Sequence, residues 1–184
     1  MGIAFRTVSA LVLVVIADGI LVTQGQEAHS IHDQTLFSEE EPLQHAVPLT
    51  PDVLSVLLKT KQAKQGLEFA NDSQRNNPAQ LFRAAEVDLR RPGEVDLVVI
   101  GILPMRGADN CWFWVVRSAR NHPKVVLIAG GNSLEVMNSR TSGYRNIRSI
   151  WSSPSDTSQK IYHFDGKSYI LWKEKWTPNR PTAP

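Results

Sequence analysis

Short apolar runs separated by turn residues dominate the chain from Gln80 onward. The runs are rich in Val, Ile and aromatic residues, which is typical of β-strands. We predict strands at residues 80–88, 95–102, 111–118, 124–129, 133–139, 144–152, 159–164 and 167–176. No helix-length segment separates them, so we expect antiparallel pairing, because parallel strands need long crossover connections.

Glycine-containing turns lie between these runs, at Pro92-Gly93, Gly130-Gly131-Asn132 and Asp165-Gly166. We predict a hairpin at each of them. The clearest is Asp165-Gly166, because a two-residue hairpin turn needs a positive φ, which glycine adopts at little cost.

A helical pattern precedes the strands. Thr50 is suited to the N-cap and Pro51 to the first helical position, and Val53, Val56 and Leu57 begin an apolar stripe. Residues 71–79 are polar and predict a loop. The expected fold class is therefore α+β, with one N-terminal helix packed on an antiparallel β-meander of about seven or eight strands. A two-sheet or half-propeller arrangement of the strands stays open.

The first 25 residues have the pattern of an export signal: one positive charge, Arg6, followed by an apolar run at residues 8–17. Small residues suited to cleavage stand at Ala17/Gly19 and at Thr23/Gly25, and we favour cleavage after Gly25. Asp18 argues against an uncleaved anchor, since a carboxylate is costly inside a bilayer. We expect a periplasmic or secreted protein that has no transmembrane anchor after cleavage.

Charge is uneven along the 184 residues, although the net charge is only +2. Residues 26–50 hold five acidic residues and no Lys or Arg, whereas residues 111–184 hold eleven Lys or Arg against four acidic residues. We predict a signal peptide at 1–25, an acidic flexible linker at 26–50, a single domain at 51–177 and a disordered tail at 178–184. No nucleic-acid partner is expected, because no basic run or nucleic-acid-binding motif occurs.

Residues 88–99 carry a recognisable spacing of acidic residues and glycine. They resemble the loop of FG-GAP (integrin-α-like) repeats, D-x-[ND]-x-D-G-x-x-D before a strand, whose carboxylates bind Ca²⁺. Asp88, Gly93 and Asp96 match the first acidic, glycine and last acidic positions, whereas Arg90 and Pro92 replace two oxygen ligands. Because Ca²⁺ takes six to eight oxygens, the resemblance implies the hairpin shape without the metal, and we expect neither metal nor cofactor.

Two interpretations of this loop stay open. Either Arg90 occupies the position of the ion and bridges Asp88 and Asp96, or all three are exposed turn charges. Residues 107–115, 141–147 and 162–169 also resemble a group of uncharacterised exported bacterial proteins. Those proteins pair an FG-GAP-like loop with an aromatic strand and a GYR-(D/N)-I segment. That resemblance implies no activity. Asp165 and Gly166 are expected to be structural turn residues.

Residue types suited to catalysis occur without a supporting pattern. Cys111 with His163 or His122 and Asp109 would provide a nucleophile, a base and an orienting group, but Cys111 precedes Trp112-Phe113-Trp114 and is expected on a buried strand. The thiol is either free or intermolecularly paired. His29, His32 and Asp33 would chelate a metal weakly. Glu86, Asp88, Glu94, Asp96 and Glu135 offer pairs of carboxylates, and the sequence selects none of them.

Aromatic and basic residues favour a binding surface. Exposed Trp and Tyr are common in binding sites for sugars and peptides, although packing in the core is the competing interpretation. The candidate binding residues are Trp112, Trp114, Arg106, Arg117, Tyr144, Arg145, Arg148 and Trp151. We predict an exported, non-enzymatic binding or interaction domain of the bacterial cell envelope, whose partner is an envelope protein or a glycan. A hydrolase with a carboxylate or Cys/His site is the alternative, and a purely structural subunit also stays open.

Overall fold

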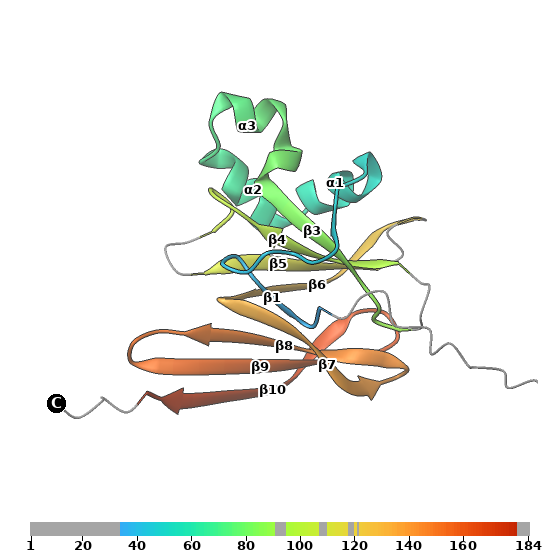
Figure 1. Ribbon diagram of the computed structural model, residues 1–184, viewed down its shortest axis with the longest axis vertical. Helices are drawn as coiled ribbons and strands as arrows, with labels where there is room; N and C mark the ends of the chain where they lie inside the picture. Colours follow the sequence, from blue (N-terminus) through green and yellow to red (C-terminus); the bar gives the residue numbers. More distant parts are fainter. Residues whose placement is uncertain (1–33, 91–94, 107–109, 118–119, 121, 180–184) are drawn as a thin grey trace, which may run out of the picture.

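The computed structural model describes residues 34–90, 95–106, 110–117, 120 and 122–179. These residues form three layers: short helices, an upper sheet and a lower sheet (Figure 1). Each sheet has five antiparallel strands, and 51% of the described residues lie in strands. The fold is therefore mostly β, and the second sheet is the feature that creates the site described below.

The upper sheet has the order β2-β3-β4-β5-β6. Its strands are β2 (Ala46–Val47), β3 (Phe82–Val87), β4 (Asp96–Gly101), β5 (Cys111–Arg117) and β6 (Lys124–Gly131). The helices cover one face of this sheet and the lower sheet covers the other. Successive side chains of a strand point to opposite faces, so each strand contributes to both cores. Phe113 and Val115 join the core between the sheets, while Trp114 and Val116 join the core under the helices.

The helical layer consists of α1 (Pro51–Leu58), α2 (Lys61–Glu68), α3 (Asp72–Asn76) and the 3₁₀ helix η1 (Pro78–Leu81). Thr50 caps α1 as expected, accepting a hydrogen bond from the amide of Val53. Thr60 divides the helical segment in two. Its hydroxyl donates to the carbonyl of Leu57 and accepts from the amide of Ala63 in α2 and from the indole of Trp114, at 3.1 Å. One side chain thus joins α1, α2 and the upper sheet.

The lower sheet has the order β1-β7-β8-β9-β10. Its strands are β1 (Leu36–Ser38), β7 (Ser133–Thr141), β8 (Tyr144–Ser152), β9 (Asp156–Phe164) and β10 (Tyr169–Pro178). Phe37, Ile147 and Phe164 are buried against the upper sheet. The edge strand β10 is exposed after Tyr169, and its Lys173, Glu174 and Lys175 stand between exposed Trp172 and Trp176.

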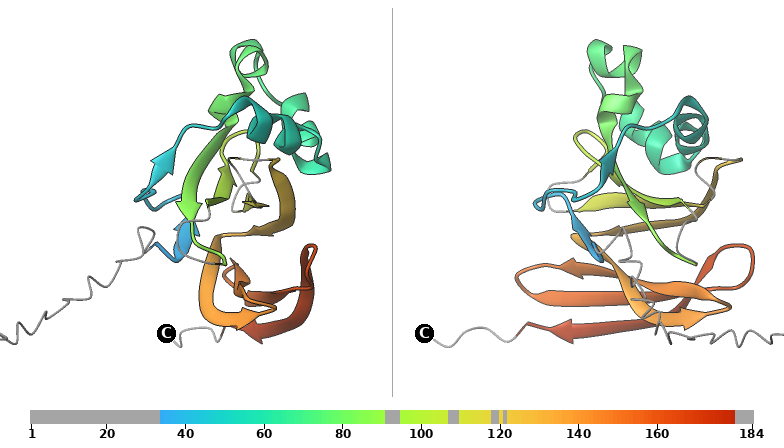
Figure 2. Two further views of the ribbon diagram at one scale, coloured as in Figure 1. Left: turned by 90° about the vertical axis from the view of Figure 1, so that its right-hand side faces the viewer. Right: turned by 45° about the vertical axis from the view of Figure 1, so that its right-hand side comes forward.

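The chain passes from one sheet to the other between β6 and β7, where the strand bends sharply (Figure 2). Gly131 permits this crossing. A Cβ built on Gly131 would lie 2.5 Å from the carbonyl oxygen of Ile150 in β8, closer than any such contact in real proteins. The amide of Asn132 donates to that same carbonyl at 2.8 Å. Glycine is therefore required here by close backbone approach.

The expected fold, one N-terminal helix on a single meander of seven or eight strands, is wrong. The eight predicted strands correspond to β3–β10, but they divide into two sheets. Two further strands, β1 and β2, add one edge strand to each sheet. Gly130-Gly131-Asn132 is no hairpin turn, since β6 and β7 belong to different sheets. Residues 71–79, predicted as a loop, contain α3 and the start of η1.

The described part of the expected acidic linker belongs to the folded unit. Residues 34–50 contribute β1 to the lower sheet and β2 to the upper sheet, and Phe37 is completely buried. The hairpin predicted at Asp165-Gly166 is present, with Gly166 at φ +101°. Its loop is longer than expected, because Phe164 pairs with Tyr169. The carboxylate of Asp165 accepts from the amides of Lys167 and Ser168, which holds its pKa below the usual value.

Candidate functional site

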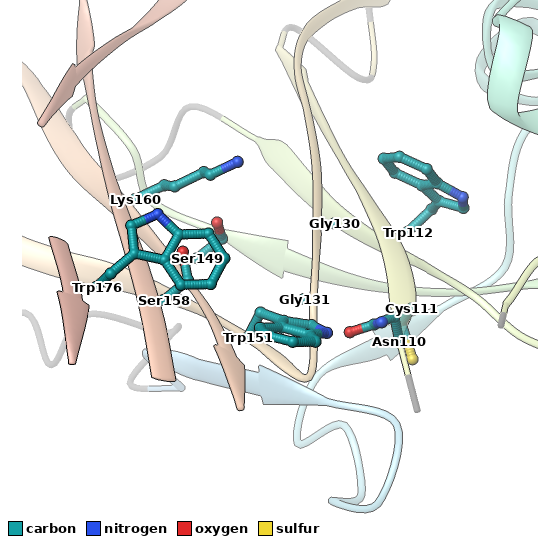
Figure 3. A pocket seen from close by; sticks show the side chains of 10 residues that line it. All are labelled: Asn110, Cys111, Trp112, Gly130, Gly131, Ser149, Trp151, Ser158, Lys160 and Trp176. Carbon is teal, nitrogen blue, oxygen red and sulfur yellow. The ribbon is translucent and has the colours of Figure 1, made fainter. Parts of the chain in front are cut away.

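A cleft of about 460 Å³ opens between the two sheets beside the β6–β7 crossing (Figure 3). Its residues come from β5 and β6 of the upper sheet and from β8, β9 and β10 of the lower sheet. They are Asn110, Cys111, Trp112, Gly130, Gly131, Ser149, Trp151, Ser158, Lys160 and Trp176. Clefts that combine aromatic faces with a few polar groups are the usual form of ligand sites.

The lower wall of the cleft is the inner face of the lower sheet, continued beyond the hydrophobic core. Ile147 of β8 is buried in that core, and Ser149 and Trp151 follow on the same face at alternate positions. Ser149 pairs across the sheet with Lys160, and Trp151 with Ser158. Polar and indole groups thus occupy positions that would carry apolar core residues if the upper sheet covered them.

Glu174 on the neighbouring edge strand organises this wall. Its carboxylate accepts a hydrogen bond from the indole of Trp176 at 3.1 Å and lies 3.5 Å from both the ammonium of Lys160 and the hydroxyl of Ser158. The ring of Trp176 meets that of Trp151 edge to face, with centroids 6.0 Å apart. Trp176 nevertheless remains 59% exposed, so its ring is held in position and is accessible.

The upper wall is built where glycine leaves room for an indole. Trp112 pairs with Gly130 across the upper sheet, and a Cβ on Gly130 would lie 3.3 Å from the Trp112 ring. Asn110 immediately precedes β5, and Figure 3 shows its amide and the indole of Trp151 pointing toward each other across the cleft. The amide oxygen of Asn110 is buried and has no hydrogen-bond partner among the described residues.

Cys111 lines the cleft as a protonated thiol. Its Sγ donates to a carboxylate oxygen of Glu39 at 3.4 Å, and the same oxygen is paired with Arg106 at 2.7 Å. Burial, and then the neighbouring Glu39, raise the pKa of Cys111 to about 11, with Arg106 opposing the shift. A thiol with this pKa is a poor nucleophile at neutral pH, since the thiolate is the reactive form.

Two of the candidate binding residues, Trp112 and Trp151, lie in the cleft. Trp114 and Tyr144 lie in the two cores instead: Trp114 is fully buried against Phe82, and the ring of Tyr144 packs at 4.0 Å from that of Phe164. These two side chains contribute to packing and present no surface to a ligand.

The candidate arginines are held by other groups of the chain. Arg106 and Arg148 pair with Glu39 and Glu135. Arg117 lies over the rings of Tyr144 and Phe164. Arg145 is buried and donates to the carbonyls of Val136 and Met137 and to Asn138, and burial lowers its pKa. Arg145 and Arg148 therefore serve the interior and the surface of the lower sheet, away from the cleft.

The FG-GAP-like segment is buried at its two acidic positions. Asp88 is 7% exposed and Asp96 is 1% exposed, so the interpretation of three exposed turn charges is wrong. The guanidinium of Arg90 lies 5.6 Å from the centre of the Tyr144 ring. Whether Arg90 bridges both carboxylates stays a prediction, and Gly93 lies outside the described residues.

The groups considered for catalysis are not assembled around Cys111. His163 stacks on Trp172 at 4.3 Å on the outer face of the lower sheet, whereas Cys111 points between the sheets. His122, with φ +52°, precedes β6 in the connection from β5. Asp109 and the potential chelating residues His29, His32 and Asp33 lie outside the described residues.

Sequence reasoning did not single out most of the lower wall. The candidate binding residues do not include Ser149, Ser158, Lys160 or Trp176. The available signal was the alternation itself. Ser158 and Lys160 are in phase with Tyr162 and Phe164 of the same strand, which pack in the core. Polar residues at such inward positions indicate where the hydrophobic core ends.

No protein-family model, characterised protein or solved structure matches the chain. Within the described residues, no group of three or more His, Cys, Asp or Glu is placed to hold a metal ion. The helices in that same part of the chain are all too short or too polar to cross a membrane.

Proposed function

We propose that the protein is an exported, non-enzymatic binding domain of the bacterial cell envelope, and that it binds its partner in the cleft between the sheets. The observation that carries this proposal is the cleft between the two sheets at the polar end of the lower sheet's inner face, where Ser149 and Ser158 are buried and Trp176 is exposed. Trp151 and Trp176 stand there beside Ser158 and Lys160, where a closed sandwich would have core residues. Export is supported by the signal-like N-terminus, and the FG-GAP-like segment fits a family of extracellular repeats.

Binding fits the chemistry of the cleft better than hydrolysis does. Its one thiol has a raised pKa and donates to a carboxylate, an arrangement opposite to that of an activated nucleophile. The carboxylate of Glu174 interacts with Trp176, Lys160 and Ser158. These interactions hold the side chains of the lower wall in place. Aromatic residues that are rigidly held and accessible supply much of the binding energy in protein interfaces.

Two tryptophans on β10 provide a matched test. Trp176 and Trp172 are 59% and 60% exposed, but Trp176 lines the cleft and Trp172 stacks on His163 on the opposite face. The full chain and the variants Trp176→Ala and Trp172→Ala would be immobilised and exposed to envelope proteins and, separately, to envelope glycans.

We expect wild type and Trp172→Ala to retain the same component, and Trp176→Ala to lose most of it. Equal retention by all three proteins would place binding outside the cleft. If nothing is retained above background, the binding proposal fails. Circular dichroism of the variants checks that the fold is kept, which we expect because both side chains are largely exposed.

A further inference from the structure

We infer that the ligand of the cleft is an extended peptide carrying an acidic side chain, which adds to β6 as a sixth strand of the upper sheet. This inference rests on the proposed function and specifies the class of partner. Its starting point is the edge of the upper sheet: among the strands that the structure describes, β6 is last in the sheet order and pairs with β5 alone. Alternate backbone amides and carbonyls of an edge strand point away from its sheet.

Two hollows follow this edge. The cleft described above includes Gly130 and Gly131, and a second hollow of about 470 Å³ includes Val125, Val126, Leu127 and Ile128. Together they accompany β6 over a length of about 20 Å, at roughly 3.3 Å for each residue. Figure 2 shows β6 at the border of its sheet, next to the β9–β10 strands.

Both hollows lie against the edge of β6 and not under one face of the sheet. The second hollow is lined by Thr60 from the helical layer and by Tyr162 and Tyr169 from the lower sheet. The first is likewise lined by Trp112 on the helix-facing side and by Trp151 on the lower-sheet side. Open space on both sides of an edge strand is what an additional strand requires, because its side chains alternate between the two faces.

The lower sheet would contact the peptide side chains that point toward it, with a different type of residue at each successive position. Tyr162, Lys160 and Ser158 follow one another at alternate positions along the inner face of β9, with Trp151 and Trp176 beyond. Lys160 is the one charged residue among the described residues that line the two hollows. Lys160 lies 3.5 Å from Glu174, but its ammonium has three N–H donors and its side chain is 41% exposed. A ligand carboxylate can therefore accept from the donors that Glu174 does not use.

A glycan would use the same tryptophans but leave the backbone edge of β6 unpaired, and the experiment separates the two classes. The probe is a phage-displayed library of random ten-residue peptides, selected on the full chain, followed by synthesis of the selected sequences. We expect these peptides to be enriched in Asp or Glu. We also expect Trp176→Ala and Lys160→Gln to weaken binding by at least tenfold, and Trp172→Ala to leave it unchanged.

Backbone methylation tests the added strand directly. Methylating every second peptide nitrogen removes the donors that face β6 in one phase, and only donors that face away in the other. We expect one phase to lose at least tenfold in affinity and the other to lose little. Equal effects of both phases, or no selected peptide that depends on Trp176, would overturn the inference. In that case, Trp176-dependent binding of envelope oligosaccharides would preserve the proposed function. If the oligosaccharides also failed to bind, the proposed function and the peptide inference would both be wrong.

Discussion

Two neighbouring glycines of β6 allow a test of how closely β6 approaches β8 where the chain crosses between the sheets. We compare Gly131→Ala with Gly130→Ala. Neither glycine has a positive φ, so both exchanges lower the conformational entropy of the unfolded chain equally, worth about 0.4–1 kcal/mol in favour of the variant. The two positions therefore differ only in what the added methyl group meets.

At Gly131 the methyl group meets backbone. The carbonyl oxygen of Ile150 would lie 2.5 Å away and that of Ser133 3.3 Å away. Relief requires β6 and β8 to separate, which breaks the hydrogen bond from the Asn132 amide to Ile150, worth about 1 kcal/mol. Strain of about 1–3 kcal/mol is typical of overpacking. After the gain in the unfolded state, we expect a net destabilisation of roughly 1–3.5 kcal/mol.

At Gly130 the methyl group meets the ring of Trp112 at 3.3 Å, and that side chain is 36% exposed and able to move. We expect the stability of Gly130→Ala to stay within about 0.5 kcal/mol of wild type. In urea unfolding, where m is about 1–3 kcal/mol per molar, Gly131→Ala should lower the midpoint by about 1 M. Equal midpoints for the two variants would refute the close approach of β6 and β8.

Two further expectations concern buried titratable groups. For Cys111, whose pKa is raised to about 11, we expect the rate of reaction with a thiol reagent to rise about tenfold per pH unit from pH 7 to 10. Glu39→Gln should accelerate the reaction at pH 8, and a plateau below pH 9 would contradict the assignment. For Tyr169, burial raises the pKa above its ordinary value of 10.0. The neutral phenol is thus favoured in the folded state, and stability should fall as pH rises above about 10. Tyr169→Phe should flatten that fall in a melting series while costing about 1–3 kcal/mol at neutral pH, since the phenol donates to the carbonyl of Arg145 at 2.8 Å.

Local elements were readable from the sequence wherever periodicity was long enough. The eight predicted strands have counterparts in β3–β10, and Thr50 caps its helix. Phe37 shows the limit of this reading, because a three-residue strand in an acidic segment has one buried side chain and no periodicity. Thr60 shows another limit. Its hydroxyl bonds locally to Leu57 and Ala63, and it also accepts from the indole of Trp114, which is far away in sequence.

The division into two sheets could not be read from alternation, because alternation does not say which strands pair. Gly131 looked like part of a turn, although its role is close contact with β8. The cleft depends on that same contact. Trp112 and Trp151 were recognised as aromatic candidates, but Ser158 and Lys160 gained a meaning only when register placed them beside Trp176.

The exposed edge of β10 also affects how copies of this chain meet. Two such strands pairing about a two-fold axis must place a central residue opposite its own copy. If the axis passes through residue 173, 174 or 175, lysine faces lysine or glutamate faces glutamate, and like charges directly opposite destabilise a pair of strands. Lys173, Glu174 and Lys175 therefore oppose symmetric self-pairing along the strand that carries Trp172 and Trp176, so these tryptophans can stay accessible without joining two molecules into a dimer.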